Sequence, residues 1–187
     1  MDMRLSLPRL LSLLVILSPS TVFAAMAPGS VQARIDPDLR GKLQRFEARL
    51  EALRRDQGIP GLSAAIVKNG KVVYLEGLGS AAGGGPATPD TAYPVPSLTG
   101  SSGHAWTVRD LANLDVLLDH GAIVEIQPYL AWHTEDLGGH RLQWAWEHQK
   151  SGSILWLKVQ EKKLSLILVG RGDIEKTAFA TALMQAF

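Results

Sequence analysis

Residues 62–76 read LSAAIVKNGKVVYLE, two runs of β-prone residues joined by Asn69-Gly70. Asn and Gly both tolerate the positive φ angles that a two-residue hairpin turn requires. The stretch therefore predicts an antiparallel hairpin with strands at residues 62–68 and 71–76. Residues 77–88 follow it and are mostly Gly, Ala, Ser and Pro, a composition that predicts a surface loop.

Three more runs in the second half of the chain have the length and composition of strands. They are residues 141–147, 154–159 and 164–169, and QEKK at residues 160–163 joins the last two. Short apolar runs separated by polar turns favour antiparallel pairing. Together with the hairpin, they predict a five-stranded antiparallel sheet.

The two ends of this region have the apolar spacing of helices. Residues 37–57 carry apolar residues at intervals of three and four, with Asp36 as the expected N-cap and Pro37 in the first turn. Residues 174–187 form the second expected helix, with Asp173 as its cap. These N- and C-terminal helices are expected to cover one face of the sheet, which gives an α+β fold.

A third helix is expected between the hairpin and the later strands. Thr107 begins it, Asp110 completes a capping box, and Gly121 ends it. Its expected apolar side consists of Leu111, Leu114, Leu117 and Leu118.

The N-terminal residues 1–24 have the features of a secretory signal peptide. Arg4 and Arg9 precede the apolar run at residues 10–17, and Ala24 supplies the small residue before the cleavage point. The run is too short to span a bilayer. We therefore expect a periplasmic or secreted protein, with residues 25–187 as a single domain and no membrane anchor.

The charge balance excludes one class of partner. The chain is 46% hydrophobic and 20% charged, and removing the leader brings its formal charge of +1 to zero. Nucleic-acid binding requires a clustered basic excess, so no nucleic acid is expected. The chain has no Cys, which leaves no disulfide and no thiol chemistry.

Residues 88–99 read TPDTAYPVPSLT, and they follow a helix, the phrase GIPGLSAAIV at residues 58–67 and a Gly-rich loop. In this order the segments resemble the start of the serine β-lactamase superfamily, in the branch of class C β-lactamases, D-alanyl-D-alanine carboxypeptidases and related esterases. The resemblance resumes at residues 107–112 and 155–168. It implies the α/β layer of the β-lactamase/transpeptidase-like fold and places Ser97 at the nucleophile position.

Two parts of the family pattern are missing from this chain. The family's nucleophile motif is S-x-x-K, whose lysine accepts the serine proton, and Gly100 stands at the lysine position. The helical subdomain that carries the family's Y-x-N motif is also missing between Thr99 and Gly103. The resemblance therefore implies an internally truncated domain with impaired catalysis.

The family's third element is a K-[ST]-G or H-x-G triad on the edge strand of the cleft. Lys150-Ser151-Gly152 has the residue types of this triad, whose cation and backbone N–H bind a substrate carboxylate and the oxyanion. The family's spacing instead puts the triad near residues 145–147. The alternative interpretation of residues 150–152 is a polar turn between two strands. His148 is a further candidate, as a displaced equivalent of the H-x-G histidine.

Other groups of residues give weaker indications of a catalytic or metal site. His104 with Asp110 is the nearest pair that could assist Ser97 as base and orienting group. The other histidines, His133, His140 and His148, lack the spacing of metal ligands, and neither a metal nor another cofactor is expected. Trp144 and Trp146 alternate on an expected strand, share one face and are expected to pack against a helix.

The resemblance implies a β-lactamase-related serine hydrolase that acts on a β-lactam, a D-alanyl peptide or an ester. Its substrate would be a small molecule or a peptidoglycan-like compound. The alternative is a non-catalytic exported remnant of the same fold, or a module of that fold that binds a ligand or a protein.

Overall fold

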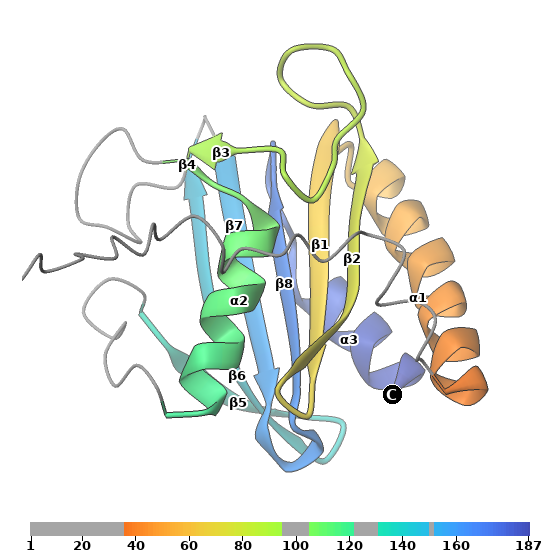
Figure 1. Cartoon of the computed structure of the whole chain (residues 1–187), viewed down its shortest axis with the longest axis vertical. Helices are drawn as coiled ribbons and strands as arrows, with labels where there is room; N and C mark the ends of the chain where they lie inside the picture. Colours follow the sequence, from red (N-terminus) through yellow and green to blue (C-terminus); the bar gives the residue numbers. More distant parts are fainter. Residues whose placement is uncertain (1–35, 95–104, 122–130, 150–151) are drawn as a thin grey trace, which may run out of the picture.

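A computed structural model describes residues 36–94, 105–121, 131–149 and 152–187. Six antiparallel strands form one sheet in the order β2-β1-β8-β7-β6-β5, with helices on both faces (Figure 1). The strands are β1 (Gly61–Lys68), β2 (Lys71–Gly79), β5 (His133–Leu137), β6 (His140–Gln149), β7 (Gly152–Val159) and β8 (Leu164–Gly170). The helices are α1 (Pro37–Asp56), α2 (Val108–Asp119) and α3 (Lys176–Ala186), with a 3-10 turn, η4 (Gln160–Lys162). A second, two-stranded sheet pairs β3 (Tyr93–Pro94) with β4 (Ala105–Trp106).

The predicted α+β class and antiparallel sheet are confirmed, but the sheet has one strand more than the five expected. The additional strand is β5, which pairs with the outer edge of β6 from His133↔Trp144 to Leu137↔His140. Its sequence, HTEDL, is polar and lacks an alternating apolar face. Main-chain pairing rather than burial stabilises it, and this explains why no apolar pattern predicted it.

The hairpin that opens the sheet forms as the sequence predicts. Asn69 and Gly70 have φ angles of 52° and 68°, and β1 and β2 pair from Gly61↔Gly79 to Lys68↔Lys71. β2 is longer than expected, because Gly77, predicted to lie in the surface loop, is still part of the strand. The backbone of Ala87 lies so close to Gly77 that no side chain fits between them.

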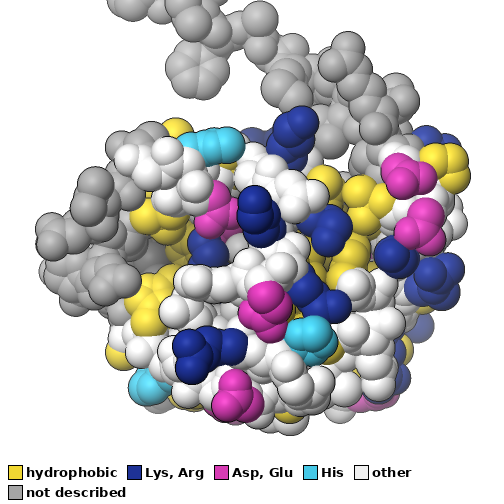
Figure 2. Space-filling model, turned by 90° about the horizontal axis from the view of Figure 1, so that it is seen from below, with side chains coloured by type: hydrophobic (Ala, Val, Ile, Leu, Met, Phe, Trp, Pro, Cys, Tyr) yellow, Lys and Arg dark blue, Asp and Glu magenta, His cyan; other side chains and the backbone are white. Residues whose placement is uncertain are grey.

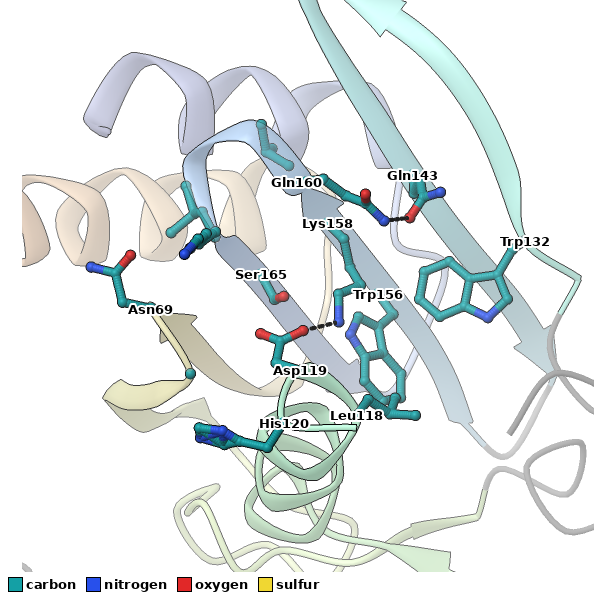
Figure 3. Close-up of a pocket in the computed structure, with 14 residues that line it drawn as sticks. Asn69, Leu118, Asp119, His120, Trp132, Gln143, Trp156, Lys158, Gln160 and Ser165 are labelled. Carbon is teal, nitrogen blue, oxygen red and sulfur yellow. Dashed lines mark hydrogen bonds and ion pairs between the residues drawn. The ribbon is translucent and has the colours of Figure 1, made fainter. Parts of the chain in front are cut away.

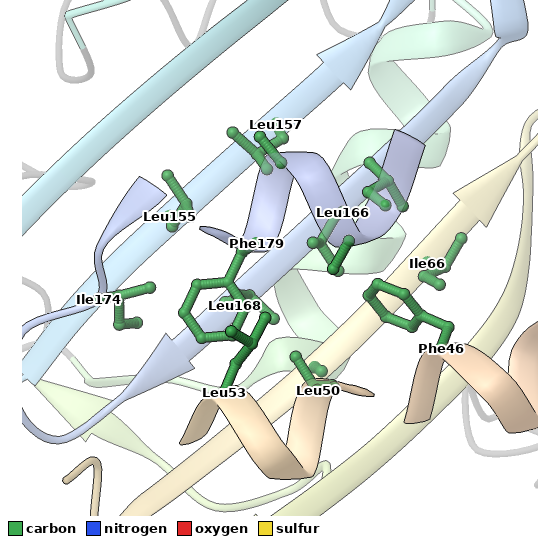
Figure 4. Close-up of a cluster of buried hydrophobic side chains, with 14 of the residues drawn as sticks. Phe46, Leu50, Leu53, Ile66, Leu155, Leu157, Leu166, Leu168, Ile174 and Phe179 are labelled. Atoms are coloured by element: carbon green, nitrogen blue, oxygen red, sulfur yellow. The ribbon is translucent and has the colours of Figure 1, made fainter. Parts of the chain in front are cut away.

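The helices α1 and α3 pack together on one face of the sheet, which confirms the expected cover by the two terminal helices (Figure 1). Leu50 of α1 and Phe179 of α3 are fully buried over the central strands. Figure 4 shows this cluster, in which the labelled side chains are Phe46, Leu50, Leu53, Ile66, Leu155, Leu157, Leu166, Leu168, Ile174 and Phe179.

The helix α2 covers the opposite face and forms a second core with β1, β7 and β8. Its buried residues are Val108, Leu111, Ala112 and Asp115. The expectation that Leu117 faces the core is wrong, because Leu117 is 43% exposed and Asp115 occupies the buried stripe instead. A carboxylate in this stripe requires partners of its own.

Helix caps were predicted at three positions, of which two are confirmed. Asp36 accepts the N–H of Asp38, and Thr107 with Asp110 forms a complete capping box. The expected cap at Asp173 is wrong, because α3 begins later and Glu175 accepts the N–H groups of Thr177 and Ala178. The buried side chain of Ile174 fills the core instead of continuing the helix.

The expectation for the paired tryptophans is correct for only one of them. Trp144 packs against the α1 and α3 cluster, and the Lys176 ammonium of α3 lies 4.2 Å from its ring centroid. Trp146 is 43% exposed and stacks on His148 instead of a helix. The helices therefore cover only the first half of β6 on this face.

Acidic and basic side chains are interspersed on the face seen from below, and neither sign dominates it (Figure 2). Within the described ranges, no helix is both long enough and apolar enough to cross a membrane.

Arg54 links the C-terminal end of α1 to the chain that follows it through hydrogen bonds. Its guanidinium binds both Glu51 oxygens at 2.7 and 2.8 Å and the carbonyl oxygen of Ile59 at 2.6 Å. The hydrogen bond from Arg54 lowers the pKa of Glu51 from 4.5 to about 2, although partial burial opposes this shift. The pair therefore stabilises the fold above pH 4.5, and this contribution is lost as the pH falls towards 2.

We expect Glu51→Gln to lower the free energy of unfolding by about 1 kcal/mol at pH 7, because solvent still partly screens this mostly buried pair. The difference from the unmodified protein should shrink between pH 4.5 and pH 2 in urea titrations. A difference that stays constant over this range would contradict the assignment.

Candidate functional site

Gly152, at the start of β7, lies at one end of the sheet beside β3. Ser97, Lys150 and Ser151 lie outside the described residues, and Gly152 is the described member of the proposed triad. Gly152 begins β7 and pairs with Gln149 of β6. A Cβ on Gly152 would lie 2.7 Å from the Pro94 carbonyl oxygen, so β3 and β7 are in direct backbone contact. The described ends of the two candidate segments therefore meet at this point.

The Thr-Pro-Asp-Thr segment forms a turn that fixes the chain before β3. Thr91 N–H donates to the Thr88 carbonyl at 3.0 Å, and Thr88 N–H donates to Thr91 Oγ1 at 2.8 Å. Asp90 accepts two hydrogen bonds from Arg109 of α2, at 2.6 and 3.1 Å. The hydrogen bond from Arg109 lowers the pKa of Asp90. Both groups are thus charged and hold the turn against the start of α2, which is a positioning role.

Beneath this turn, Tyr93 and Ser63 form a buried polar contact. Ser63 Oγ donates to the Thr88 carbonyl at 2.7 Å and lies 3.3 Å from Tyr93 Oη, to which it can also donate. Burial raises the pKa of Tyr93, and the hydrogen bond with Ser63 opposes this shift. The phenol therefore stays protonated at neutral pH and does not supply a base for a nearby serine.

The position that the family spacing assigns to the triad is occupied by Ala145, Trp146 and Glu147. Ala145 is buried in the core beneath α2, so the alternation of β6 places Glu147 on the same face. Gln149 Nε2 donates to Glu147 Oε1 at 2.6 Å, whereas Glu147 Oε2 is buried with no partner in the described chain. Ala145 therefore stands at the position of the triad's cation and cannot bind a substrate carboxylate, and a carboxylate two residues later, at Glu147, would repel one.

His148, the candidate for a displaced H-x-G histidine, lies on the side of β6 that faces α1 and α3. It lies opposite Ser153 in the strand pairing, and Ser153 lies on the face of β7 that carries the Leu155 and Leu157 side chains towards α1 and α3. His148 Nδ1 lies 2.7 Å from Ser153 Oγ, which itself donates to the Gly172 carbonyl. The hydroxyl proton is therefore already engaged, and Ser153 is fully buried. This serine and histidine contact is structural rather than nucleophilic.

The remaining described candidates are Asp110, His133 and His140, and each takes part in a structural contact. His104 lies outside the described residues, and the side chain of Asp110 is committed to the cap of α2. His133 stacks on Trp144, and His140 lies 3.1 Å from Glu161. Among the described residues, no three His, Asp or Glu side chains lie close enough together to hold a metal.

Two buried carboxylates near the α2 face were not predicted from the sequence. They are Asp115 and Glu147, each with one oxygen that has no partner among the described residues. A signal for Asp115 existed, because the residue falls at the helical interval that follows Val108, Leu111 and Ala112. No comparable signal exists for Glu147, which stands among the polar residues at the end of its strand.

Comparison with known proteins supports the sequence resemblance. The Beta-lactamase family model matches residues 46–124, a range that includes Ser97 and α2. A search of curated protein sequences gives no significant match. Among solved structures, the fold is similar to that of the octameric penicillin-binding protein homologue from Pyrococcus abyssi, with a TM-score of 0.59 and 10% identity over 76% of this chain and 77% of that chain. Residues 46–124 are therefore similar to the Beta-lactamase family, and the described chain shares the fold of this penicillin-binding protein homologue.

Proposed function

We propose that this chain is an exported, β-lactamase-related serine hydrolase of low activity, with Ser97 as its nucleophile. Its substrate would be a β-lactam, a D-alanyl peptide or an ester, which acylates Ser97 before water releases the product. The observation that carries the proposal is the family match across residues 46–124, because this range contains Ser97. The contact between Gly152 and Pro94 supports it, since it brings the start of β7 beside the end of β3, which is the last described residue before Ser97.

Low activity follows from the groups that surround this position. Gly100 replaces the proton-accepting lysine of the family, and Ala145 stands at the position of the cation on the edge strand. Nucleophile and base act as one unit, so loss of the base costs about 10⁴-fold in turnover, by analogy with serine triads. Acylation is then slow but still detectable as a covalent adduct.

The test is intact-mass spectrometry of the purified protein after incubation with a penicillin or a fluorophosphonate. We expect one stoichiometric adduct that is absent from Ser97→Ala, with nitrocefin turnover about 10⁴-fold below that of family enzymes that retain the lysine. Ser153→Ala is the matched control and should keep the adduct. Absence of any adduct would overturn the hydrolase proposal, and turnover equal to that of intact family enzymes would overturn the role given to Gly100.

A second candidate function is a non-catalytic binding module of the same fold, either a remnant of the enzyme or a domain that binds a peptidoglycan-like or protein ligand. Glu147 at the triad position and the exposed ring of Trp146 beside it favour this alternative. Quenching of tryptophan fluorescence by muropeptides, lost in Trp146→Phe and combined with absence of the Ser97 adduct, would support this alternative over the hydrolase.

A further inference from the structure

A pocket of about 640 Å³ lies at the opposite end of α2 from the candidate site. Its walls are the C-terminal end of α2, the Asn69-Gly70 turn and the neighbouring parts of β6, β7 and β8 (Figure 3). In Figure 1, α2 runs from the β3–β4 end of the sheet down to this end. The volume is in the range of pockets that bind small molecules. The pocket is therefore separate from the region around Pro94 and Gly152.

One wall of the pocket is aromatic. The rings of Trp132 and Trp156 meet edge to face, with their centroids 5.7 Å apart and their planes at 64°. Trp156 is fully buried, whereas Trp132 is partly exposed beside it. Figure 3 shows the Trp132 ring at the side of the pocket and Trp156 deeper, next to Leu118. Trp132 thus offers a flat apolar surface to a ligand.

The charges of the deep wall are already paired. Lys158 Nζ lies 2.8 Å from Asp115 Oδ1 and 2.9 Å from Asp119 Oδ1 (Figure 3 shows the second contact). Trp156 Nε1 donates to Asp115 Oδ1 at 2.9 Å. Burial lowers the pKa of Lys158, but the two aspartates outweigh this effect and the net pKa is raised. Lys158 is therefore charged but occupied, and it is not available to bind a phosphate or carboxylate ligand.

Lys163 and His120 also line the pocket, and the other polar groups are neutral and both donate and accept hydrogen bonds. The amides of Asn69, Gln143 and Gln160 and the hydroxyl of Ser165 line the pocket. Gln160 Nε2 donates to Gln143 Oε1 at 2.7 Å, which leaves Gln143 Nε2 as a donor and Gln160 Oε1 as an acceptor. Such a set matches a ligand whose own groups both donate and accept, which is the property of hydroxyls.

We propose that this pocket binds a saccharide, with one apolar C–H face of the sugar ring against Trp132 and the ring hydroxyls on Gln143 and Gln160. A sugar ring combines an apolar face with hydroxyls around its edge, as the pocket combines an indole surface with neutral amides. The volume fits one or two rings. This site does not depend on any reaction at Ser97.

Isothermal titration calorimetry of the full chain with cellobiose, maltose and N,N′-diacetylchitobiose tests the proposal, with indole and benzoate as comparison ligands. We expect at least one disaccharide to bind, and Trp132→Ala to weaken this binding about tenfold or more. Gln160→Ala should weaken it too, and its exposed position makes it a variant that folds. Leu117→Ala is the control, because this exposed side chain of α2 lies outside the residues that line the pocket.

Two results would overturn the proposal. One is absence of binding by all three disaccharides, whether or not indole or benzoate binds. The other is disaccharide binding that both Trp132→Ala and Gln160→Ala leave unchanged while each variant retains the thermal stability of the unmodified protein.

Discussion

Replacing Lys158 with Met lowers the free energy of unfolding by about 3–5 kcal/mol, because it leaves the buried carboxylate of Asp115 without its cation. Trp156 Nε1 would then be the remaining donor to Asp115 among the described residues, and Asp115 Oδ2 already has no partner. Urea denaturation at pH 7 measures the loss.

The matched control for this prediction is the double variant Asp115→Asn with Lys158→Met. The Asn side chain keeps an oxygen that can accept from Trp156 Nε1 but carries no charge, so most of the lost stability should return. A double variant as unstable as Lys158→Met alone would show that packing around the lysine chain, rather than the charge pair, stabilises this region.

Gly77→Ala is expected to destabilise the fold by about 3 kcal/mol or more. A Cβ at this position would lie 2.2 Å from the carbonyl oxygen and 2.3 Å from the carbonyl carbon of Ala87. Both atoms belong to the main chain, so the loop that ends at Ala87 must move away from β2. This movement would disturb the hydrogen bond from Ala87 N–H to the Gly79 carbonyl and the adjacent Thr88 turn.

Gly83→Ala in the same Gly-rich segment is the control for this prediction. A Cβ there meets nothing within 4 Å, and its backbone does not need a positive φ. Its unfolding free energy should stay within about 0.5 kcal/mol of the unmodified protein. Equal thermal stability of Gly77→Ala and Gly83→Ala would contradict the close approach of β2 and Ala87.

The features that sequence could predict are local ones. The Asn69-Gly70 turn, the Asp36 cap and the Thr107 capping box each depend on a few adjacent residues. The features it missed depend on partners that are distant in the chain. The strand β5 exists through pairing with β6, and the burial of Asp115 depends on Lys158 and Trp156, more than forty residues later.

The candidate site also combines a local feature that the sequence predicts with features that depend on distant residues. The motif around Ser97 is a local pattern, and the family match covers it. Whether a strand residue faces the cleft depends on register, and a one-residue change of register reverses the face. This is why the structure was needed to place His148 on the side of α1 and α3 and Glu147 on the side of α2.

The sheet order has a consequence for how this chain acquires its structure. The strand β8 lies between β1 and β7, and it pairs with β1 from Leu62↔Gly170 to Lys68↔Leu164. Until β8 is in place, the β1–β2 hairpin and the β5–β6–β7 meander are two separate units. Each of them lacks β8, the strand that joins them into one sheet. A ribosome releases β8 only after both units have emerged, so the central pairing forms late in synthesis. Long sequence separation between paired strands slows folding, and we therefore expect one cooperative step that waits for this strand.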